Sequence, residues 1–96
     1  SRSQNKVEQS PRLLTVKAGE DSTFKCSYKI TPFNNLQWFK QSPGKGLVFL
    51  TFTRFSDETK SNGRFKATIN ATSEEGYLRV TSSQSKDSAT YFCVAS

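Results

Sequence analysis

The chain of 96 residues is poor in the residue types that do most protein chemistry: it has two cysteines, Cys26 and Cys93, and no histidine. A structural zinc site normally takes four cysteine or histidine ligands, so two cysteines alone fall short of one. Two free buried thiols are one remaining reading, and a disulfide, which suits an extracellular domain, fits better. A disulfide that closes a loop of this length would stabilise the fold by roughly 4 kcal/mol on the chain-entropy model.

A second chemical signal concerns the cellular compartment. Residues Asn70 to Thr72 form an N-glycosylation sequon, which agrees with an extracellular setting. No apolar run approaches the length of a membrane span, and no charged-then-apolar leader opens the chain. If the protein is secreted or tethered to the plasma membrane, we expect its signal and its anchor to lie outside this segment.

Composition disfavours several classes of function. Without histidine, the candidate nucleophiles are serines and threonines that lack a base, and there is no Gly-rich phosphate loop. The net charge of +6 comes from scattered lysines and arginines, which form neither a run nor a stripe interleaved with aromatic residues. We therefore expect no enzymatic activity, no cofactor, no metal and no nucleic-acid partner.

The elements that must position these residues are short strands separated by Gly, Pro, Ser and Asn. Alternation in residues 22–28 places Phe24, Cys26 and Tyr28 on one face, and residues 82–88 could form one helical turn. Strands at this spacing indicate an antiparallel sandwich or barrel in one domain, residues 1–96. The polar residues 1–6 fit a native edge, a frayed terminus or a cloning remnant. The other inward positions are Leu36, Trp38, Phe65, Ala67, Ile69, Leu78, Val80, Tyr91 and Cys93.

A set of framework residues narrows the kind of sandwich. Cys26 on the second strand is followed twelve residues later by Trp38, and Tyr91 stands two residues before Cys93. In this arrangement a disulfide joins the two sheets, the Trp38 indole packs against it, and the Tyr91 hydroxyl bonds to backbone at the corner before the last strand. The set resembles an immunoglobulin domain of variable type.

Two further features fit the variable type. Asp87 stands four residues before Tyr91, and Arg64 is expected to pair with it across the bottom of the sandwich. The segment 47–63 is long enough for the extra C′ and C″ strands of that type.

Four segments make the resemblance closer than a fold. KVEQSP, WFKQSPGKGL, GRFKATIN and DSATYFCVAS are similar to the germline-encoded variable segment of a T-cell receptor alpha chain, over about residues 6–96. Antibody light chains share the Cys, Trp and Tyr-x-Cys frame but less often combine these segments. Within the alpha family, ITPFNNLQWFKQ and TKSNGRF look most similar to the segment used by semi-invariant natural killer T-cell receptors.

Several residues suggest a partner domain. Phe39, Gln41, Leu47 and Phe92 each alternate with an inward residue, so they share an outer face, where apolar side chains need a reason. The resemblance implies that this face, with Pro43, packs against a beta-chain variable domain. Gln41 would pair with its counterpart across the pseudo-twofold axis. Leu47 stands where alpha chains often carry proline, so local packing is expected to differ there.

The resemblance places ligand contacts in two loops. In loop 1, Pro32 restricts the backbone and Phe33 offers a rigid aromatic ring, although Phe33 could instead fold back into the loop core. Loop 2 has mixed charges that suit a polar rim contact or a solvated turn. The expected contact residues are Thr31, Pro32, Phe33, Asn34 and Asn35 in loop 1, and Arg54, Phe55, Ser56, Asp57 and Glu58 in loop 2.

The resemblance also implies the ligand and the place of action. The ligand would be a peptide presented by an MHC molecule or, on the natural killer T-like reading, a lipid presented by an MHC-like molecule. The related segment tends to have serine where Asn34 stands. The domain would act on the extracellular side of the plasma membrane. An antibody light-chain-like domain and a non-rearranging adhesion or innate receptor domain are the alternatives.

The end of the chain carries its own expectation. It stops at DSATYFCVAS, without the final strand G of a complete variable domain. A bare strand edge invites pairing with another chain. We therefore expect the domain as it stands to be poorly stable or self-associating.

Overall fold

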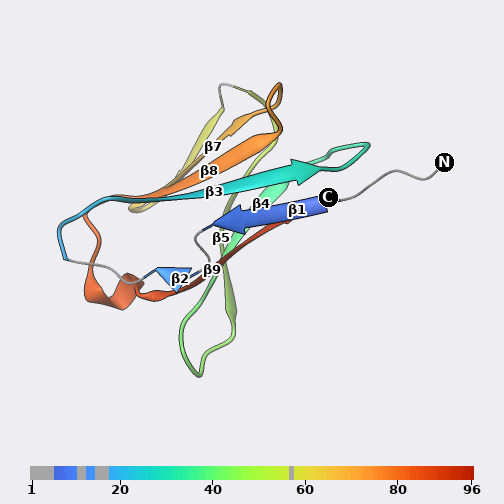
Figure 1. Cartoon of the computed structure of the whole chain (residues 1–96). Coiled ribbons are helices and arrows are strands. Elements are labelled where there is room, and N and C mark those ends of the chain that lie inside the picture. Colours follow the sequence, from blue (N-terminus) through green and yellow to red (C-terminus); the bar gives the residue numbers. More distant parts are fainter. Residues whose placement is uncertain (1–5, 11–12, 15–17, 57) are drawn as a thin grey trace.

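The computed structural model describes residues 6–10, 13–14, 18–56 and 58–96, which form two antiparallel β-sheets packed face to face (Figure 1). A 3₁₀ turn, η1 (Ser85–Asp87), precedes the last strand. The predicted all-β antiparallel sandwich is confirmed. One sheet has the order β1 (Lys6–Ser10), β3 (Ser22–Lys29), β8 (Glu75–Val80), β7 (Phe65–Asn70) and β6 (Thr59–Asn62). The other has the order β2 (Leu13–Leu14), β9 (Ala89–Ala95), β4 (Leu36–Gln41) and β5 (Leu47–Thr53).

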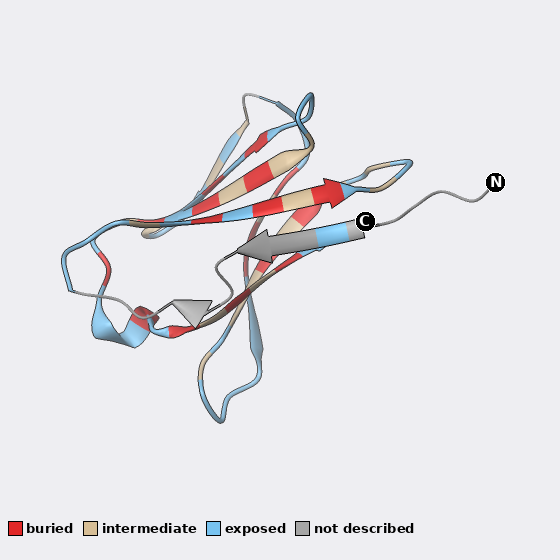
Figure 2. Ribbon diagram, in the orientation of Figure 1, coloured by how far each residue is buried: buried red, intermediate tan, exposed pale blue. Residues whose placement is uncertain are grey.

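Alternation of side chains builds the core between the sheets. On β3, Phe24, Cys26 and Tyr28 are buried, whereas Thr23 and Lys25 are exposed, as the period of two requires. Figure 2 shows this alternation along β3 and β8. The other predicted inward residues are buried too, apart from the partly buried Phe65: Leu36, Trp38, Ala67, Ile69, Leu78, Val80, Tyr91 and Cys93.

The two cysteines form the disulfide that the sequence favours. The bond links Cys26 of β3 to Cys93 of β9, and therefore one sheet to the other, with Cα atoms 6.4 Å apart. Trp38 of β4 lies opposite Cys93 in the β4–β9 register and is fully buried in the same cluster. Phe24 and Tyr91 continue the cluster from opposite sheets, with ring centroids 4.6 Å apart. Covalent and packing contacts thus hold the sheets together at the centre.

An ion pair supports the sandwich near η1. Arg64 donates from Nη1 and Nη2 to the two carboxylate oxygens of Asp87, at 2.5 and 2.8 Å. Asp87 is only 1% exposed, and its carboxylate also accepts the backbone N–H of Gln84 at 2.7 Å. The Arg64 guanidinium and the Gln84 N–H hold the pKa of Asp87 below its ordinary value, against the opposing effect of burial. Tyr91 donates its hydroxyl to the Asp87 carbonyl at 2.6 Å, and burial raises the pKa of Tyr91.

The long segment 47–63 forms two strands, as its length predicts, but they belong to different sheets. β5 pairs with β4, whereas β6 pairs with β7. The reason is local: Gly63, at φ 60°, occupies the left-handed region that glycine adopts readily. Residues 63–64 therefore make a two-residue turn that closes β6 and β7 into a hairpin. Asn62 still reaches β5, because its Nδ2 donates to the Leu50 carbonyl at 2.8 Å.

The edge of β9 is not bare along its first two residues, contrary to the expectation from the sequence. β2 pairs antiparallel with β9, with Leu13 opposite Thr90 and Leu14 opposite Ala89. The expectation of self-association rested on an unpaired edge, so this pairing removes part of its basis. Self-association itself stays a prediction.

Candidate functional site

Apolar side chains gather on the outer face of the four-stranded sheet. Leu47, Phe49 and Val94 expose 59%, 50% and 46% of their surface, and Phe39 and Phe92 between them are partly buried. Phe39 of β4 lies opposite Phe49 of β5 on one side and Phe92 of β9 on the other. The Phe39 and Phe49 rings meet edge to face, with centroids 5.7 Å apart. We call these five residues the apolar face.

A β-bulge aims Phe49 outward. The β4–β5 register shifts at this point, so that Trp38 lies opposite Thr51 and Phe39 lies opposite Phe49. Leu50 is the extra residue, and both Leu50 and Thr51 are buried. A bulge changes the direction of the side chains that follow it. Without the shift, Phe49 would share the side of Thr51 and point into the core.

The apolar face is hollowed by a pocket of about 330 Å³. Phe39, Gln41, Leu47 and Phe92 all line it, so four of the five predicted interface residues come together. The fifth, Pro43, is exposed in the β4–β5 turn and lines a separate hollow of about 210 Å³. Gln41 Nε2 donates to the Lys45 carbonyl in that turn at 3.0 Å, so this donor is engaged within the chain. The role of these residues in pairing stays a prediction.

Sequence reasoning misses Phe49 and Val94. A signal for both was present, since Phe49 stands two residues from Leu47 and Val94 two residues from Phe92. Side chains two residues apart on a strand share a face. The dense apolar run of residues 47–52 obscured this, because five of its six residues are apolar and no alternation is visible.

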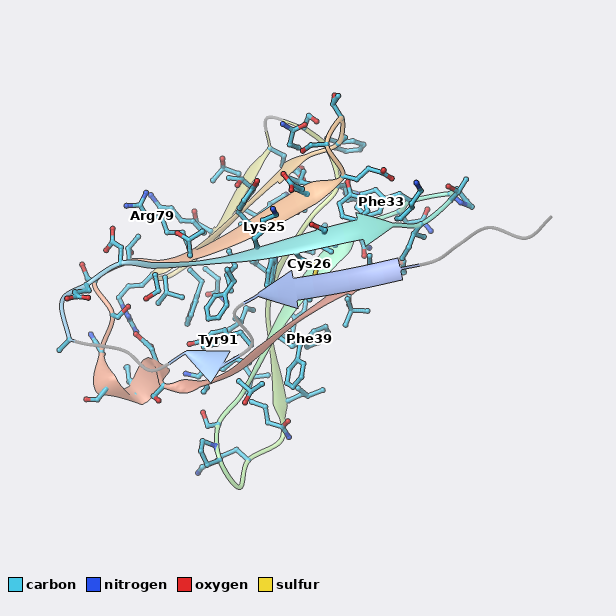
Figure 3. All side chains as sticks on the ribbon, viewed as in Figure 1. Lys25, Cys26, Phe33, Phe39, Arg79 and Tyr91 are labelled. Atoms are coloured by element: carbon cyan, nitrogen blue, oxygen red, sulfur yellow. A yellow bond between two sulfur atoms is a disulfide. The ribbon has the colours of Figure 1, made fainter. Side chains whose placement is uncertain are left out.

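Loop 1, residues 29–35, packs one of its predicted contact residues inward. The Phe33 ring is half-buried and stacks on Tyr28, with centroids 4.3 Å apart and planes 18° from parallel. Figure 3 shows Phe33 close to the end of β3. Of the two readings of Phe33, the structure therefore matches the loop core. Thr31, Pro32 and Asn34 are exposed and remain available for contact.

Backbone hydrogen bonds join loop 1 to Ser96, which follows β9. The N–H groups of Asn34 and Asn35 donate to the Ser96 carbonyl at 2.6 and 3.1 Å. The Ser96 N–H donates to the Asn35 carbonyl at 3.0 Å, and the Ser96 hydroxyl lies 3.3 Å from Asn35 Oδ1. These contacts hold loop 1 beside the end of β9.

Loop 2, residues 53–59, is closed by its own carboxylate. The Arg54 N–H donates to Glu58 Oε1 at 2.8 Å, and the Glu58 N–H donates to the Phe55 carbonyl at 3.1 Å. The Arg54 N–H is the main cause that lowers the pKa of Glu58. Phe55 is 62% exposed, and the Arg54 guanidinium lies over its ring, 5.2 Å from the centroid. Ser56 is exposed, and Asp57 lies outside the described residues.

Three further features concern the glycosylation sequon, metal ligands and membrane spans. Asn70 is the last residue of β7 and is exposed. Within residues 6–10, 13–14, 18–56 and 58–96, no group of three or more potential metal ligands occurs. No helix in the same part of the chain is long and apolar enough to cross a membrane.

Comparisons with known proteins assign this arrangement to a family. The model of the immunoglobulin V-set domain matches residues 9–96, nearly the whole chain. The chain belongs to the immunoglobulin V-set family. Human T cell receptor alpha variable 17 is 41% identical over 86 residues, which cover 90% of this chain and 76% of the relative. Human T cell receptor alpha variable 22 is 44% identical over 87 residues, covering 91% and 76%.

A third relative of this V-set domain has a double name. Human T cell receptor alpha variable 23/delta variable 6 is 40% identical over 93 residues, which cover 97% of this chain and 77% of the relative. The V-set domain is thus homologous to T cell receptor alpha variable segments, as the resemblance implied. The finer resemblance to the segment of natural killer T-cell receptors is not confirmed.

Proposed function

We propose that this V-set domain is the antigen-recognition module of a T-cell receptor alpha chain and pairs with a beta-chain variable domain. One observation carries the proposal: the apolar face spans three adjacent strands and leaves Leu47 and Phe49 at least half exposed. Contiguous exposed apolar side chains mark an interaction surface. Homology to alpha variable segments supports a variable domain as the partner.

The geometry of the sheet links pairing to recognition. β4, β5 and β9 form the apolar face; β4 begins directly after loop 1, β5 ends at loop 2, and β9 ends at Ser96. A partner docked on this face would therefore place its own loops beside loops 1 and 2. We infer a composite ligand surface in which Thr31, Pro32 and Asn34 of loop 1 and Phe55 of loop 2 contribute exposed side chains.

The ligand class follows from homology and not from a pocket. We propose a peptide presented by an MHC molecule, with a lipid on an MHC-like molecule as the alternative, and action on the extracellular side of the plasma membrane. A binding assay of the paired receptor against peptide-loaded and lipid-loaded presenters separates the two. Binding only to lipid-loaded presenters would support the natural killer T-like reading, and binding only to peptide-loaded presenters would end it.

Pairing is tested by placing a charge on the apolar face. Phe92→Glu should weaken heterodimer formation by at least about 100-fold, because the interface would bury an unpaired carboxylate. Co-expression with a beta chain, followed by size-exclusion chromatography, measures the paired fraction. Phe49→Glu repeats the test at a half-exposed position whose loss the core tolerates.

The matched control lies on the other sheet. Thr68→Glu places the same charge on an exposed position of β7 and should leave pairing unchanged. Unchanged pairing of both Phe variants, or equal loss in the Thr68 variant, would contradict the proposed interface.

A further inference from the structure

The N-glycosylation sequon begins at the last residue of β7 and continues into the β7–β8 turn, where hydrogen bonds orient the side chain of the acceptor Asn70. Asn70 Oδ1 accepts the backbone N–H groups of Thr72 and Ser73, at 3.1 and 3.2 Å. Both of these bonds use the carbonyl oxygen, and neither uses Nδ2, the atom to which a glycan is joined. Asn70, Ala71 and Thr72 are all exposed. The sequon is therefore accessible in the folded domain.

The same turn touches loop 2. The backbone N–H of Ala71, the middle residue of the sequon, donates to Ser56 Oγ at 2.9 Å. Ser56 stands next to Phe55, the exposed aromatic residue of loop 2. Figure 1 shows the β7–β8 turn and the connection from β5 to β6 at the same end of the sandwich. A group attached to Asn70 would thus start one residue away from a direct contact with loop 2.

We propose that Asn70 carries an N-linked glycan and that this glycan covers the flank of loop 2. In the reaction, the Asn70 amide nitrogen attacks the anomeric carbon of a lipid-pyrophosphate-linked oligosaccharide. A carbon–nitrogen bond forms, the glycosyl–phosphate bond breaks, the amide loses one proton, and the lipid pyrophosphate leaves. The product is bulky and hydrated.

The consequence concerns the ligand. A glycan at this position hinders the approach of any large partner to Ser56 and Phe55 from the β7–β8 side. Ligands would therefore reach loop 2 from the side of β5, away from the β7–β8 turn. This part rests on the proposed function, in which loop 2 contacts ligand, whereas the glycan and its shielding do not.

The test uses two substitutions at one residue. Thr72→Ala removes the sequon and leaves Asn70 in place, and Thr72→Ser keeps the sequon. The complete receptor chain is expressed with a beta chain in mammalian secretory cells, and glycan occupancy of Asn70 is read by mass spectrometry. We expect a glycan in the wild type and in Thr72→Ser, and none in Thr72→Ala.

Shielding is measured with a reporter thiol. Each background also carries Phe55→Cys, and the rate of reaction with a bulky polyethylene-glycol maleimide is measured and corrected for the chain without the reporter. The described residues contain no free cysteine of their own. We expect the reporter at position 55 to react severalfold faster in Thr72→Ala than in Thr72→Ser. Glu20→Cys, on an exposed residue of the β2–β3 connection, should react equally fast in both.

The outcomes are separable. Absence of a glycan in the wild type overturns the proposal, and equal rates at position 55 with the glycan present overturn the shielding. Failure of the proposed function would instead appear as loss of pairing with the beta chain in every background, whatever the state of Asn70.

Discussion

The two sheets share one core and present opposite chemistry outward. On the four-stranded sheet the outer positions of β4, β5 and β9 carry Phe39, Phe49 and Phe92. On the five-stranded sheet the outer positions of β3, β7 and β8 carry charged, hydroxyl and phenol groups. Figure 3 shows Lys25 and Arg79 on that sheet, away from Phe39. The outer positions of β3, β7 and β8 include Thr23, Lys25, Lys66, Thr68, Tyr77 and Arg79.

The charged sheet neutralises part of its own surface. Lys25 Nζ lies 2.8 Å from Glu75 Oε2, and Arg79 Nη2 lies 2.6 Å from Asp21 Oδ2. The Glu75 carboxylate raises the pKa of Lys25, and the Lys25 ammonium in turn lowers the pKa of Glu75. The side chains of both pairs are partly exposed, so their charges remain in contact with water. The two outer faces therefore differ in kind: one presents paired charges that stay in contact with solvent, and the other presents exposed apolar side chains.

The largest expected effect on stability comes from breaking the buried Arg64–Asp87 ion pair, which joins the two sheets. Asp87→Asn should lower the free energy of unfolding by about 3 kcal/mol, because it removes one charge of a buried ion pair and leaves the Arg64 guanidinium without its counter-charge. Denaturant unfolding followed by the fluorescence of Trp38, the sole tryptophan of the chain, measures it. Asp21→Asn makes the same change in an exposed pair and should have a much smaller effect. Equal effects would show that burial does not distinguish the two pairs.

A smaller effect is expected from acid. The folded-state pKa of Asp87 is depressed from its ordinary value of 3.8, mainly by Arg64, so the unfolded chain binds the proton more tightly. The stabilisation is therefore fully present above the unfolded pKa and is lost as pH falls through the folded pKa. The stability difference between wild type and Asp87→Asn should be constant from about pH 5 to 7 and shrink below about pH 4. A difference that grows in acid would reverse the assigned sign.

The smallest effect is expected on the charged face. Glu75→Gln removes the carboxylate that pairs with Lys25, half of whose side chain is exposed. The melting temperature should change by no more than about 3 °C, and by less at high salt, because exposed ion pairs contribute little and are screened. Pairing with a beta chain should not change. A clear loss of pairing would place part of the interface on this sheet and break the comparison.

Much of the fold could be predicted from the alternation of side chains. Phe24, Cys26 and Tyr28 alternate with polar residues and are buried, since a period of two leaves one face for the core. The Arg64–Asp87 pair was also expected from the set of framework residues, and it joins the β6–β7 turn of one sheet to η1, which precedes β9 of the other.

What the sequence missed or left open depended on geometry that local patterns encode only weakly. A one-residue bulge between β4 and β5 decides that Phe49 points outward, and the apolar run around it hides the shift. The stacking of Phe33 on Tyr28 depends on how loop 1 closes over β3, which its sequence alone leaves open. The length of segment 47–63 predicted its two strands, but the turn at Gly63, with its positive φ, was needed to show that β6 joins β7.

The placement of β6 has a consequence for loop 2. Because β5 and β6 belong to different sheets, the two ends of loop 2 are fixed to different layers, and the Asn62–Leu50 hydrogen bond holds them together. A segment restrained in this way samples fewer conformations before it meets a ligand. If loop 2 contacts ligand as proposed, it would lose less conformational entropy on binding, so that more of its contact energy would remain as affinity.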